Sequence, residues 1–448
     1  MSEQEVLDFV VDTRWHDLPR HVRRQAKMCL LDNLGVTLAG ALTHVAQITA
    51  AYASRTWTGD GATILLQDQR SSPLGAAFAN GWAANAIDSD DIIRYAGHAG
   101  GQVFPVALAL AEAGGMSGAR MLSALVVGYE VAHRVGRCWH DAHEVYQSEG
   151  AWGSVACAAT TAHLMGLEPA LVAHALGIAE YHAPNAPMMV DIDHPAMVKH
   201  AMGWGTMNGV ISAQLAAEGF TGTPSILARD RYSDWVNDIG QRYVMVDGVT
   251  RKRKGFACCA WTHGAAEGAR RLADEHEVQL KEIAGIRVET FHEGWRLGTG
   301  LPESTEEAQF NMAWAVAAML VDGEIGPRQT LEERLGDPEL RKVARKVEVV
   351  ESEDLNELAA LFEKGDQRGC WASRVTLMLN DGRQLTSGLE DGGFHFPGQA
   401  WGEDDVEEKF RWLADHVLDQ GRIDDLVALA WRFEKVPDVG ELTDLVAR

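Results

Sequence analysis

Three carboxylates within four residues form the first group of side chains whose types and spacing suit chemistry. They are Asp88, Asp90 and Asp91, and His98 follows with two glycines close behind it. Carboxylates this close repel one another, so their clustering indicates a metal ion, a cationic neighbour or a raised pKa. The alternative is a solvated loop or a helix N-terminus, where acids suit the helix dipole.

Two cationic segments are the next candidates. Lys199 lies in the apolar run MVKHAM, where burial would lower its pKa toward use as a general base. A lysine that extends along an amphipathic helix into solvent is the alternative. Residues 251–254 are four consecutive cations in a chain of net charge −24, and they could form either an anion site or a solvated loop. The run continues into an apolar segment that ends at His263, which indicates that Lys254 points inward.

Neither the histidines nor the cysteines form a recognisable metal site. Residues 140–146 hold two histidines and two acids, but His140 and His143 are only three residues apart and no third ligand is near. We therefore expect no metal there. The six cysteines are scattered, without the C-x-x-C spacing of zinc or iron–sulfur sites, and they indicate a reducing, cytoplasmic setting.

The overall composition excludes several classes of protein. The 448 residues are 46% hydrophobic and 23% charged, which is typical of a globular chain with a large core. An acidic balance argues against nucleic acid or an anionic membrane as a partner, because phosphate binding needs a basic face. The first residues lack the pattern of a secretion signal, and residues 34–54 are predicted to be a buried helix pair rather than a membrane span.

The elements that must position these side chains are mostly helices. From residue 1 to about 265, apolar residues recur three or four positions apart, as in residues 103–110 and 122–129. Residues 150–166 are rich in glycine and alanine and almost without charge. This composition predicts a buried helix that its neighbours approach closely.

The pattern changes after about residue 280. Alternating apolar residues predict strands at 286–291, 346–349 and 373–379, and an Asn-Asp-Gly turn after the third strand predicts a hairpin with residues 383–386. A helix is predicted at 306–321, between the first two strands. Helical patterns return near the C-terminus.

These patterns together predict a mainly α protein. A large helical domain is expected at residues 1–268, and a smaller inserted α+β lid domain at 269–392. The C-terminal segment, residues 393–448, is expected to return to the helical domain.

Short matches to one family are spread along most of the chain. The sequence resembles the MmgE/PrpD family, which includes 2-methylcitrate dehydratase, cis-aconitate decarboxylase and iminodisuccinate epimerase. The residues that carry the resemblance are Leu31–Gly35, Asn80–Gly81, Asp88–Asp91, His98, Lys254, Cys258, Cys259, His263, Ala308–Phe310, Asp322–Gly323, Pro397 and Lys409–Phe410.

The resemblance implies a helical domain with a smaller lid, usually assembled as a homodimer. It also implies a polar pocket between the domains that binds a small anionic polycarboxylate without a redox cofactor. The residues whose motifs place them in that pocket are Asp88, His98, Lys199, Lys254 and His263.

The reactions of the family share one hard step, removal of a proton from carbon next to a carboxylate, or its reverse. Lys254 and His263 are the candidates for holding substrate carboxylates, and Lys199 is the candidate base. Asp88 would orient or polarise His98 to give an acid–base pair.

Three further residues are assigned to substrate binding. Asp91 belongs to the acidic motif, and Arg253 belongs to a cationic run that would attract the substrate from a distance. Trp314 stands where the dehydratase and decarboxylase relatives carry a tyrosine.

Other departures from the family pattern bear on the reaction. Glu144 stands where those relatives carry a histidine, with His143 one place earlier and Tyr146 two places later, and Asn85 replaces another histidine. An epimerase needs two acid–base groups on opposite faces of one carbon. Tyr146 or His143, placed across from Lys199, would supply the second group.

The sequence therefore favours an epimerase or isomerase. The alternative is a lyase, either a 2-methylcitrate dehydratase-like hydro-lyase or a cis-aconitate decarboxylase-like enzyme. The acidic motif also spells the DxDD of class II terpene cyclases, but the chain has no Gln-Trp motif of that class. A non-enzymatic helical scaffold is disfavoured by the many ionisable residues in apolar surroundings.

Overall fold

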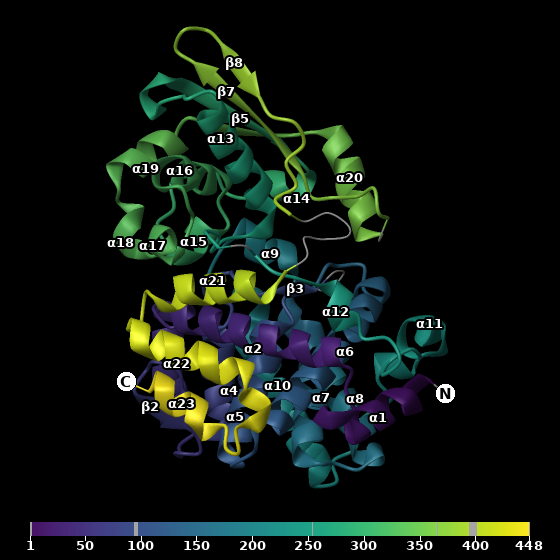
Figure 1. The fold of residues 1–448 in the computed structure, drawn as a ribbon. Helices are drawn as coiled ribbons and strands as arrows, with labels where there is room; N and C mark the ends of the chain where they lie inside the picture. The colour runs from purple at the N-terminus through teal and green to yellow at the C-terminus, as the bar shows by residue number, and fades with distance from the viewer. Residues whose placement is uncertain (1, 94–96, 253, 365, 394–400, 448) are drawn as a thin grey trace.

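The molecule consists of two bodies stacked on each other, both rich in helices (Figure 1). The larger body contains both chain termini and, besides helices, two two-stranded sheets, whereas the smaller body contains a four-stranded sheet. The predicted mainly α fold, with a smaller α+β part inserted before the C-terminal return, is confirmed. The computed structural model describes residues 2–93, 97–252, 254–364, 366–393 and 401–447.

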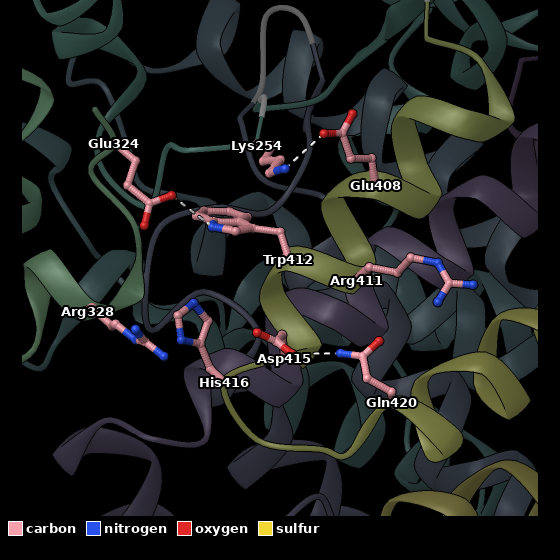
Figure 2. A pocket seen from close by; sticks show the side chains of 9 residues that line it. All are labelled: Lys254, Glu324, Arg328, Glu408, Arg411, Trp412, Asp415, His416 and Gln420. Atoms are coloured by element: carbon pink, nitrogen blue, oxygen red, sulfur yellow. Dashed lines mark hydrogen bonds and ion pairs between the residues drawn. The ribbon is translucent and has the colours of Figure 1, made fainter. Parts of the chain in front are cut away.

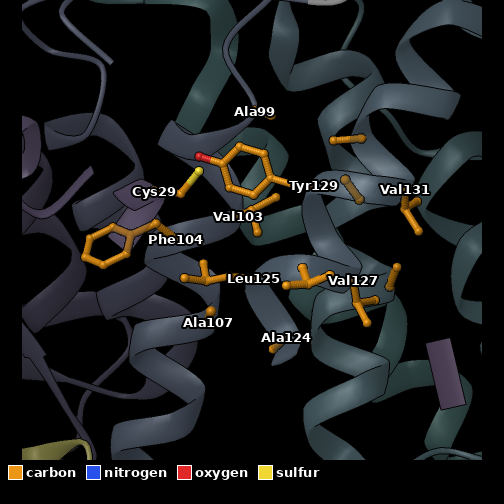
Figure 3. Close-up of a cluster of buried hydrophobic side chains, with 14 of the residues drawn as sticks. Cys29, Ala99, Val103, Phe104, Ala107, Ala124, Leu125, Val127, Tyr129 and Val131 are labelled. Atoms are coloured by element: carbon orange, nitrogen blue, oxygen red, sulfur yellow. The ribbon is translucent and has the colours of Figure 1, made fainter. Parts of the chain in front are cut away.

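The larger body is a bundle of helices around a large apolar core, beside which a smaller apolar cluster includes Phe78 and Trp82. The helix predicted at 150–166 is α7 (Glu149–Met165), which is buried along nearly its whole length and packs against α6 and α10. Figure 3 shows part of the core, where Phe104 and Tyr129 lie near Leu125. The other elements here are α1 (Ser2–Asp12), α2 (Arg20–Gly40), α3 (His44–Thr56), β1 (Ala62–Ile64), β2 (Gln69–Ser71), α4 (Pro73–Ala83), β3 (Ile92–Ile93), α5 (Gly100–Ala113), α6 (Gly118–Ala142), α8 (Pro169–Tyr181), α10 (Met202–Ala217), α11 (Ser233–Val236), α12 (Val244–Gly248) and β4 (Val249–Thr250). The short helix α9 (Met188–Asp193) lies at the junction, and its Met188 and Ile192 pack in the core of the smaller body.

Hydroxyl caps fix where several of these helices begin. The side chains of Thr43, Ser72 and Ser117 accept hydrogen bonds from the first turns of α3, α4 and α6. Each cap satisfies a backbone N–H that has no partner inside its helix. The residues at which these helices begin are therefore determined by the local sequence.

The helix pair predicted near residues 34–54 is α2 and α3, which are bent by 93° to each other. Most of α2 is buried in the core. Within the described residues, no single helix combines the length and the apolar content needed to cross a bilayer, although this bent pair passes on length and composition.

The smaller body is built on a sheet of order β6-β5-β7-β8. β5 (Ile283–Thr290) pairs in parallel with β6 (Val347–Glu351) and antiparallel with β7 (Ser373–Leu379), which turns into β8 (Gln384–Thr386). The predicted strands and the predicted hairpin are thus confirmed. The helices of this body are α13 (His263–Glu275), α14 (His292–Trp295), α15 (Thr305–Gln309), α16 (Met312–Asp322), α17 (Pro327–Thr330), α18 (Glu332–Leu335), α19 (Pro338–Ala344) and α20 (Glu353–Glu363).

The helix predicted at 306–321 is divided into α15 and α16. Asn311 lies between the two parts, and its side chain accepts a hydrogen bond from the backbone N–H of Trp314. A side chain that caps a new helix competes with continuation of the previous one. The break leaves Gln309 at the end of α15, facing the larger body.

The C-terminal helices return to the larger body, as predicted. In Figure 1 they form the yellow layer beside the purple α2, and they comprise α21 (Glu403–Ala414), α22 (Gln420–Trp431) and α23 (Gly440–Val446). The contact between α2 and α21 is close at Gly35, where an added Cβ would lie 3.0 Å from Cδ2 of Phe410. A larger residue at this position would push the two helices apart.

The division into domains follows the two apolar cores. The predicted boundary at residue 268 falls inside α13, whose buried residues Ala265, Ala266 and Leu272 all pack in the core of the smaller body. Phe256 packs in the same core. We propose that the smaller domain begins near residue 256.

Candidate active site

A fully buried loop, residues 84–93, carries the predicted acids to the junction of the two bodies. It follows α4 and ends in β3, which pairs antiparallel with β4, Ile92 opposite Thr250. The residues that follow β4 are therefore held beside the loop. These residues are Arg251 and Lys252.

Asp88 is the centre of the site. Its backbone is left-handed, with a φ of 50°, a conformation that a residue other than glycine rarely adopts. Its carboxylate lies 2.8 Å from the ammonium of Lys252 and 3.4 Å from Nε2 of His98. Nδ1 of His98 is 2.9 Å from Oδ1 of Asp90. His98 is thus held between two carboxylates from one loop.

Lys199 and His200 reach the same place from the short helix η2 (Lys199–Ala201). His200 and Ala201 both have a φ of 55°, so the chain turns sharply here before α10. Nζ of Lys199 donates to the carbonyl of Asn85 and to the side-chain oxygen of Gln309, both at 2.6 Å. Because Gln309 belongs to the smaller body, the site lies between the two bodies.

Two further carboxylates surround His200. Its Nδ1 is 3.0 Å from Oδ2 of Asp191 and 3.8 Å from Oε2 of Glu149, and its ring stacks on His98 with the centroids 5.6 Å apart. The side chain of Glu149 packs directly against the backbone of Gly97, whose φ is 98°. A Cβ added at Gly97 would lie 2.0 Å from Oε1 of Glu149. Only glycine permits this approach.

Burial and neighbouring charges set the protonation states in this cluster. Burial by itself would lower the pKa of His200, but its two carboxylate neighbours raise it to about 9, so it is an imidazolium at neutral pH. Burial lowers the pKa of Lys199. Burial would also raise the pKa of Asp88 and lower that of Lys252, but in both cases their mutual attraction, together with the other charges nearby, outweighs burial. The site therefore holds a cationic histidine, a lysine whose charged form is disfavoured by burial and a fixed ammonium–carboxylate pair.

The spacing at this site would suit a metal ion, but its charges would not. Ligand atoms of Asp88, His98 and His200 lie within 4.8 Å of one another. However, the ammonium of Lys252 is 2.8 Å from Asp88, and the raised pKa of His200 keeps it protonated. Both features oppose a cation, because a histidine binds metal only in its neutral form. The charges of the cluster suit proton transfer and anion binding better than a cation.

A second buried network lies behind the loop. Asp91 accepts a hydrogen bond from the hydroxyl of Tyr129, and Asp32 is 2.6 Å from Nζ of Lys409 and 3.5 Å from Nε of Arg251. Burial, and then the Asp32 carboxylate, raise the pKa of Asp91 to about 6. This network connects α2, α21 and the segment after β4.

The structure brings three of the predicted site residues together in the cluster: Asp88, His98 and Lys199. His263 lies one layer behind, with Nε2 3.3 Å from the carbonyl of Cys258 and its ring stacked on Phe256. Asp91 faces the second network. Both residues therefore support the cluster from behind.

Lys254 and Trp314 lie elsewhere. The chain turns at Lys254, whose side chain is 48% exposed and lies 2.9 Å from Glu408 on the surface. Lys252, two residues earlier, takes the inward position that was predicted for Lys254. Trp314 is fully buried in the smaller body, where its indole N–H donates to the carbonyl of Gln329. A substrate between the bodies would not reach it.

His143 and Tyr146 lie at and beyond the end of α6. The ring of His143 stacks on Trp139 at 4.7 Å, and Tyr146 is 37% exposed with its ring 4.9 Å from that of His140. Tyr146 also lies near Glu149, whose charge helps to raise the pKa of its hydroxyl after burial, the largest cause, so it borders the cluster without a described hydrogen bond to it. Arg253 lies outside the described residues.

Sequence reasoning missed four members of the cluster: His200, Lys252, Glu149 and Asp191. A signal was present for His200, which follows Lys199 directly in the same apolar run, and for Lys252, which belongs to the cationic run. The two acids gave no signal of their own. They are brought in by the start of α7 and the end of α9.

Lys254, which is not part of the cluster, lines a surface cleft of about 430 Å³ between α21 and residues 324–328 of the smaller body. Figure 2 shows its ion pair with Glu408 and, across the cleft, the 3.1 Å hydrogen bond from the indole of Trp412 to Glu324. This cleft lies at an outer contact between the two bodies and is separate from the buried cluster.

The chain was compared with known families and curated proteins. Residues 4–236 match the MmgE/PrpD N-terminal domain, and residues 256–432 match the MmgE/PrpD C-terminal domain. The chain is similar to a cis-aconitate decarboxylase of Aspergillus terreus, with 25% identity over 99% of this chain and 95% of the relative. A cis-aconitate decarboxylase of Homo sapiens is 27% identical over 96% of this chain and 91% of its own length. The family matches span most of the chain, confirm the resemblance seen in the sequence and give no support to a terpene cyclase. This chain belongs to the MmgE/PrpD family.

Proposed function

We propose that this chain is a lyase that forms a carbanion next to a carboxylate of a small di- or tricarboxylate, with decarboxylation as the first candidate reaction. One observation carries the proposal: distant segments deliver two lysines, two histidines and their carboxylate partners to one buried cluster. Such a set can bind a carboxylate, stabilise developing negative charge and transfer protons. The names of the relatives, cis-aconitate decarboxylases, favour a lyase over the epimerase predicted from the sequence.

Lys252 is the group that would bind a substrate carboxylate. The residue is only 1% exposed, and its ammonium is fixed by three partners: the carboxylate of Asp88 at 2.8 Å, the carbonyl of Asp88 and the carbonyl of Cys258 at 3.1 Å. Because its three N–H groups are already used, Lys252 would attract a substrate carboxylate through its positive charge. A cation that is already fixed in a water-poor site, like a preorganised donor, loses nothing to reorganisation when charge develops on the substrate. One such donor is worth about 3 kcal/mol of transition-state stabilisation.

His200 is the group that would donate a proton. Loss of carbon dioxide breaks a carbon–carbon bond and leaves its electron pair on the substrate carbon. The imidazolium of His200 then gives its proton to that carbon, and solvent restores the imidazolium. The carboxylates of Asp191 and Glu149 hold it in the charged form before each turnover.

An isomerase or epimerase is the second candidate, because burial disfavours the charged form of Lys199 while the neighbouring carboxylates favour the charged form of His200. The lowered pKa of Lys199 would let it accept the proton next to the carboxylate, and His200 would return one. In a dehydratase the same histidine would protonate the departing hydroxide. The three reactions thus use one cluster and differ in the fate of the carbanion.

The test is incubation with a panel of di- and tricarboxylates, including cis-aconitate, in deuterated water. Decarboxylation would release carbon dioxide and place one deuteron on the product carbon. A new double bond without carbon dioxide would indicate dehydration, and deuterium on the substrate without net product would indicate epimerisation. Absence of both turnover and exchange with every compound would contradict the proposal.

A matched pair of lysine variants tests which cation binds the substrate. We expect Lys252→Met to lower kcat/KM about 100-fold, the effect of losing one preorganised donor. Lys254→Met should change it less than about twofold, because that side chain is 48% exposed and pairs only on the surface. Steady-state kinetics measures both. The reverse order of effects would restore Lys254 to the binding role predicted from the sequence.

The homodimer and the cytoplasmic location stay predictions. The larger body exposes aromatic side chains at Tyr52, Trp204 and Phe220, which are 43%, 46% and 50% exposed. Sedimentation velocity over a range of concentrations would test self-association.

A further inference from the structure

We propose that Lys409, on the C-terminal helix α21, is a positioning residue for the loop that carries Asp88. Lys409 acts through the backbone of Ser89 and lies in the layer behind the cluster. Its role in turnover depends on the function proposed above, but its effect on the loop can be measured without turnover.

Lys409 is completely buried and has two partners. Its Nζ donates to the carbonyl of Ser89 at 2.7 Å and lies 2.6 Å from Oδ1 of Asp32. The hydroxyl of Ser89 in turn donates to the carbonyl of Phe256 at 2.9 Å. The residue between the two carboxylates of the site is thus held from both sides.

The loop needs such support because its conformation is strained. Asp88 has a φ of 50°, which an L-residue adopts at a cost in free energy. Strained backbone persists only where the surroundings hold it. The carbonyl that Lys409 binds belongs to the next residue, so the ammonium acts directly beside the strained position.

The same network also reaches the cation that faces Asp88. Arg251 lies 3.5 Å from the second oxygen of Asp32, and the residue after it is Lys252. Asp32 therefore connects Lys409, which holds the loop, with the segment that presents Lys252. A change at Lys409 is expected to shift both members of the Asp88–Lys252 pair.

The helices bring this pair together by close packing. Asp32 lies on α2 and Lys409 on α21, and the approach at Gly35 against Phe410 leaves no room for water between the helices at that point. The C-terminal helix, more than 300 residues along the chain from the loop, therefore contributes to the geometry of the site.

The test compares Lys409→Met with Lys27→Met. Lys27 is a matched control because it also bridges α2 and the C-terminal part, 2.6 Å from Glu434 and donating to the carbonyl of Trp431 at 2.7 Å. For Lys409→Met we expect kcat to fall about 10- to 100-fold, as misplaced catalytic groups do, with KM changed less than about threefold. Amide hydrogen exchange in peptides covering residues 84–93 should rise. Lys27→Met should leave kcat, KM and this exchange at wild-type values.

A second variant covers the case in which Lys409→Met is poorly folded. Asp32→Asn combined with Lys409→Met removes both charges of this pair, which the fold often tolerates, but it also takes from Arg251 the carboxylate that lies 3.5 Å from its Nε. The double variant should recover part of the resistance to denaturant that Lys409→Met loses, while keeping the low kcat and the faster exchange. If the Asp32–Lys409 pair only stabilised the fold, the double variant would recover stability, kcat and slow exchange together.

The proposal is overturned if the folded variants at position 409 keep wild-type kcat and wild-type exchange in residues 84–93. It is also overturned if Lys27→Met reproduces both effects. If no panel compound is turned over by the wild type, the exchange experiment still decides the role of Lys409. Failure of the proposed reaction and failure of the positioning role are thus distinguishable.

Discussion

Replacing His200 with glutamine should lower kcat by about 100-fold or more, the contribution of a general acid. Glutamine keeps a hydrogen-bond donor of similar size but carries no proton to give. Two carboxylates are placed to keep the wild-type ring charged, Asp191 at 3.0 Å and Glu149 at 3.8 Å. Steady-state turnover at pH 7 measures the loss.

The pH dependence of this variant gives a second readout. The pKa of His200 is raised to about 9 in the folded chain, against an ordinary value of 6.5. A raised pKa means that the ring stabilises the fold fully below pH 6.5 and that this contribution is lost as the pH rises through 9. Wild-type kcat and unfolding free energy should therefore both fall on this alkaline limb. In the glutamine variant the decline in unfolding free energy should be smaller.

His182→Gln is the control, because that ring sits at the end of α8 and bonds only to the carbonyl of Ile178 among its described hydrogen bonds. It should leave kcat and the pH profile unchanged. If His200→Gln kept more than a tenth of wild-type kcat, the role of His200 as proton donor would be wrong.

Asp88→Asn should damage stability and activity together. The substitution leaves the ammonium of Lys252 buried without its counter-ion, a change that costs about 3–5 kcal/mol of unfolding free energy. It also frees His98 from one of its two carboxylates, and kcat/KM should fall at least 100-fold. Denaturant unfolding and steady-state kinetics measure the two effects.

Two comparisons make the Asp88 result specific. Asp354→Asn removes an exposed carboxylate that pairs with Arg374, and such surface pairs are worth at most about 1 kcal/mol. Combining Asp88→Asn with Lys252→Met should restore part of the lost stability but none of the activity. If Asp354→Asn destabilised the chain as much as Asp88→Asn, the loss of stability could not be attributed to the buried Asp88–Lys252 pair.

Much of the fold follows from local sequence. Alternating apolar residues mark β5, β6 and β7, and the Asn-Asp-Gly turn marks the hairpin to β8. The charge-poor stretch at 150–166 marks α7, because a helix without charge must be buried. The break between α15 and α16 was not predicted, since the helical pattern continues through the capping residue Asn311.

The sequence predicted those residues of the site whose types and sequence neighbours are unusual by themselves. Asp88 and His98 lie ten residues apart in the sequence, and Lys199 lies in an apolar run, so their types and surroundings indicated chemistry. The choice between Lys252 and Lys254 depends on strand pairing and on a turn, neither of which appears in the residue types. Glu149 and Asp191 gain their role only from the tertiary contact of α7 and α9 with His200.

The two-residue ribbon of β3 and β4 has a consequence for loop engineering. Adjacent side chains of extended backbone point to opposite sides, so Arg251 meets Asp32 while Lys252 meets Asp88. Inserting or deleting one residue after Thr250 would exchange the two cations, just as a one-residue slip reverses the faces of a strand. Chimaeric enzymes built by grafting this segment must therefore keep its length, whatever other residues they change.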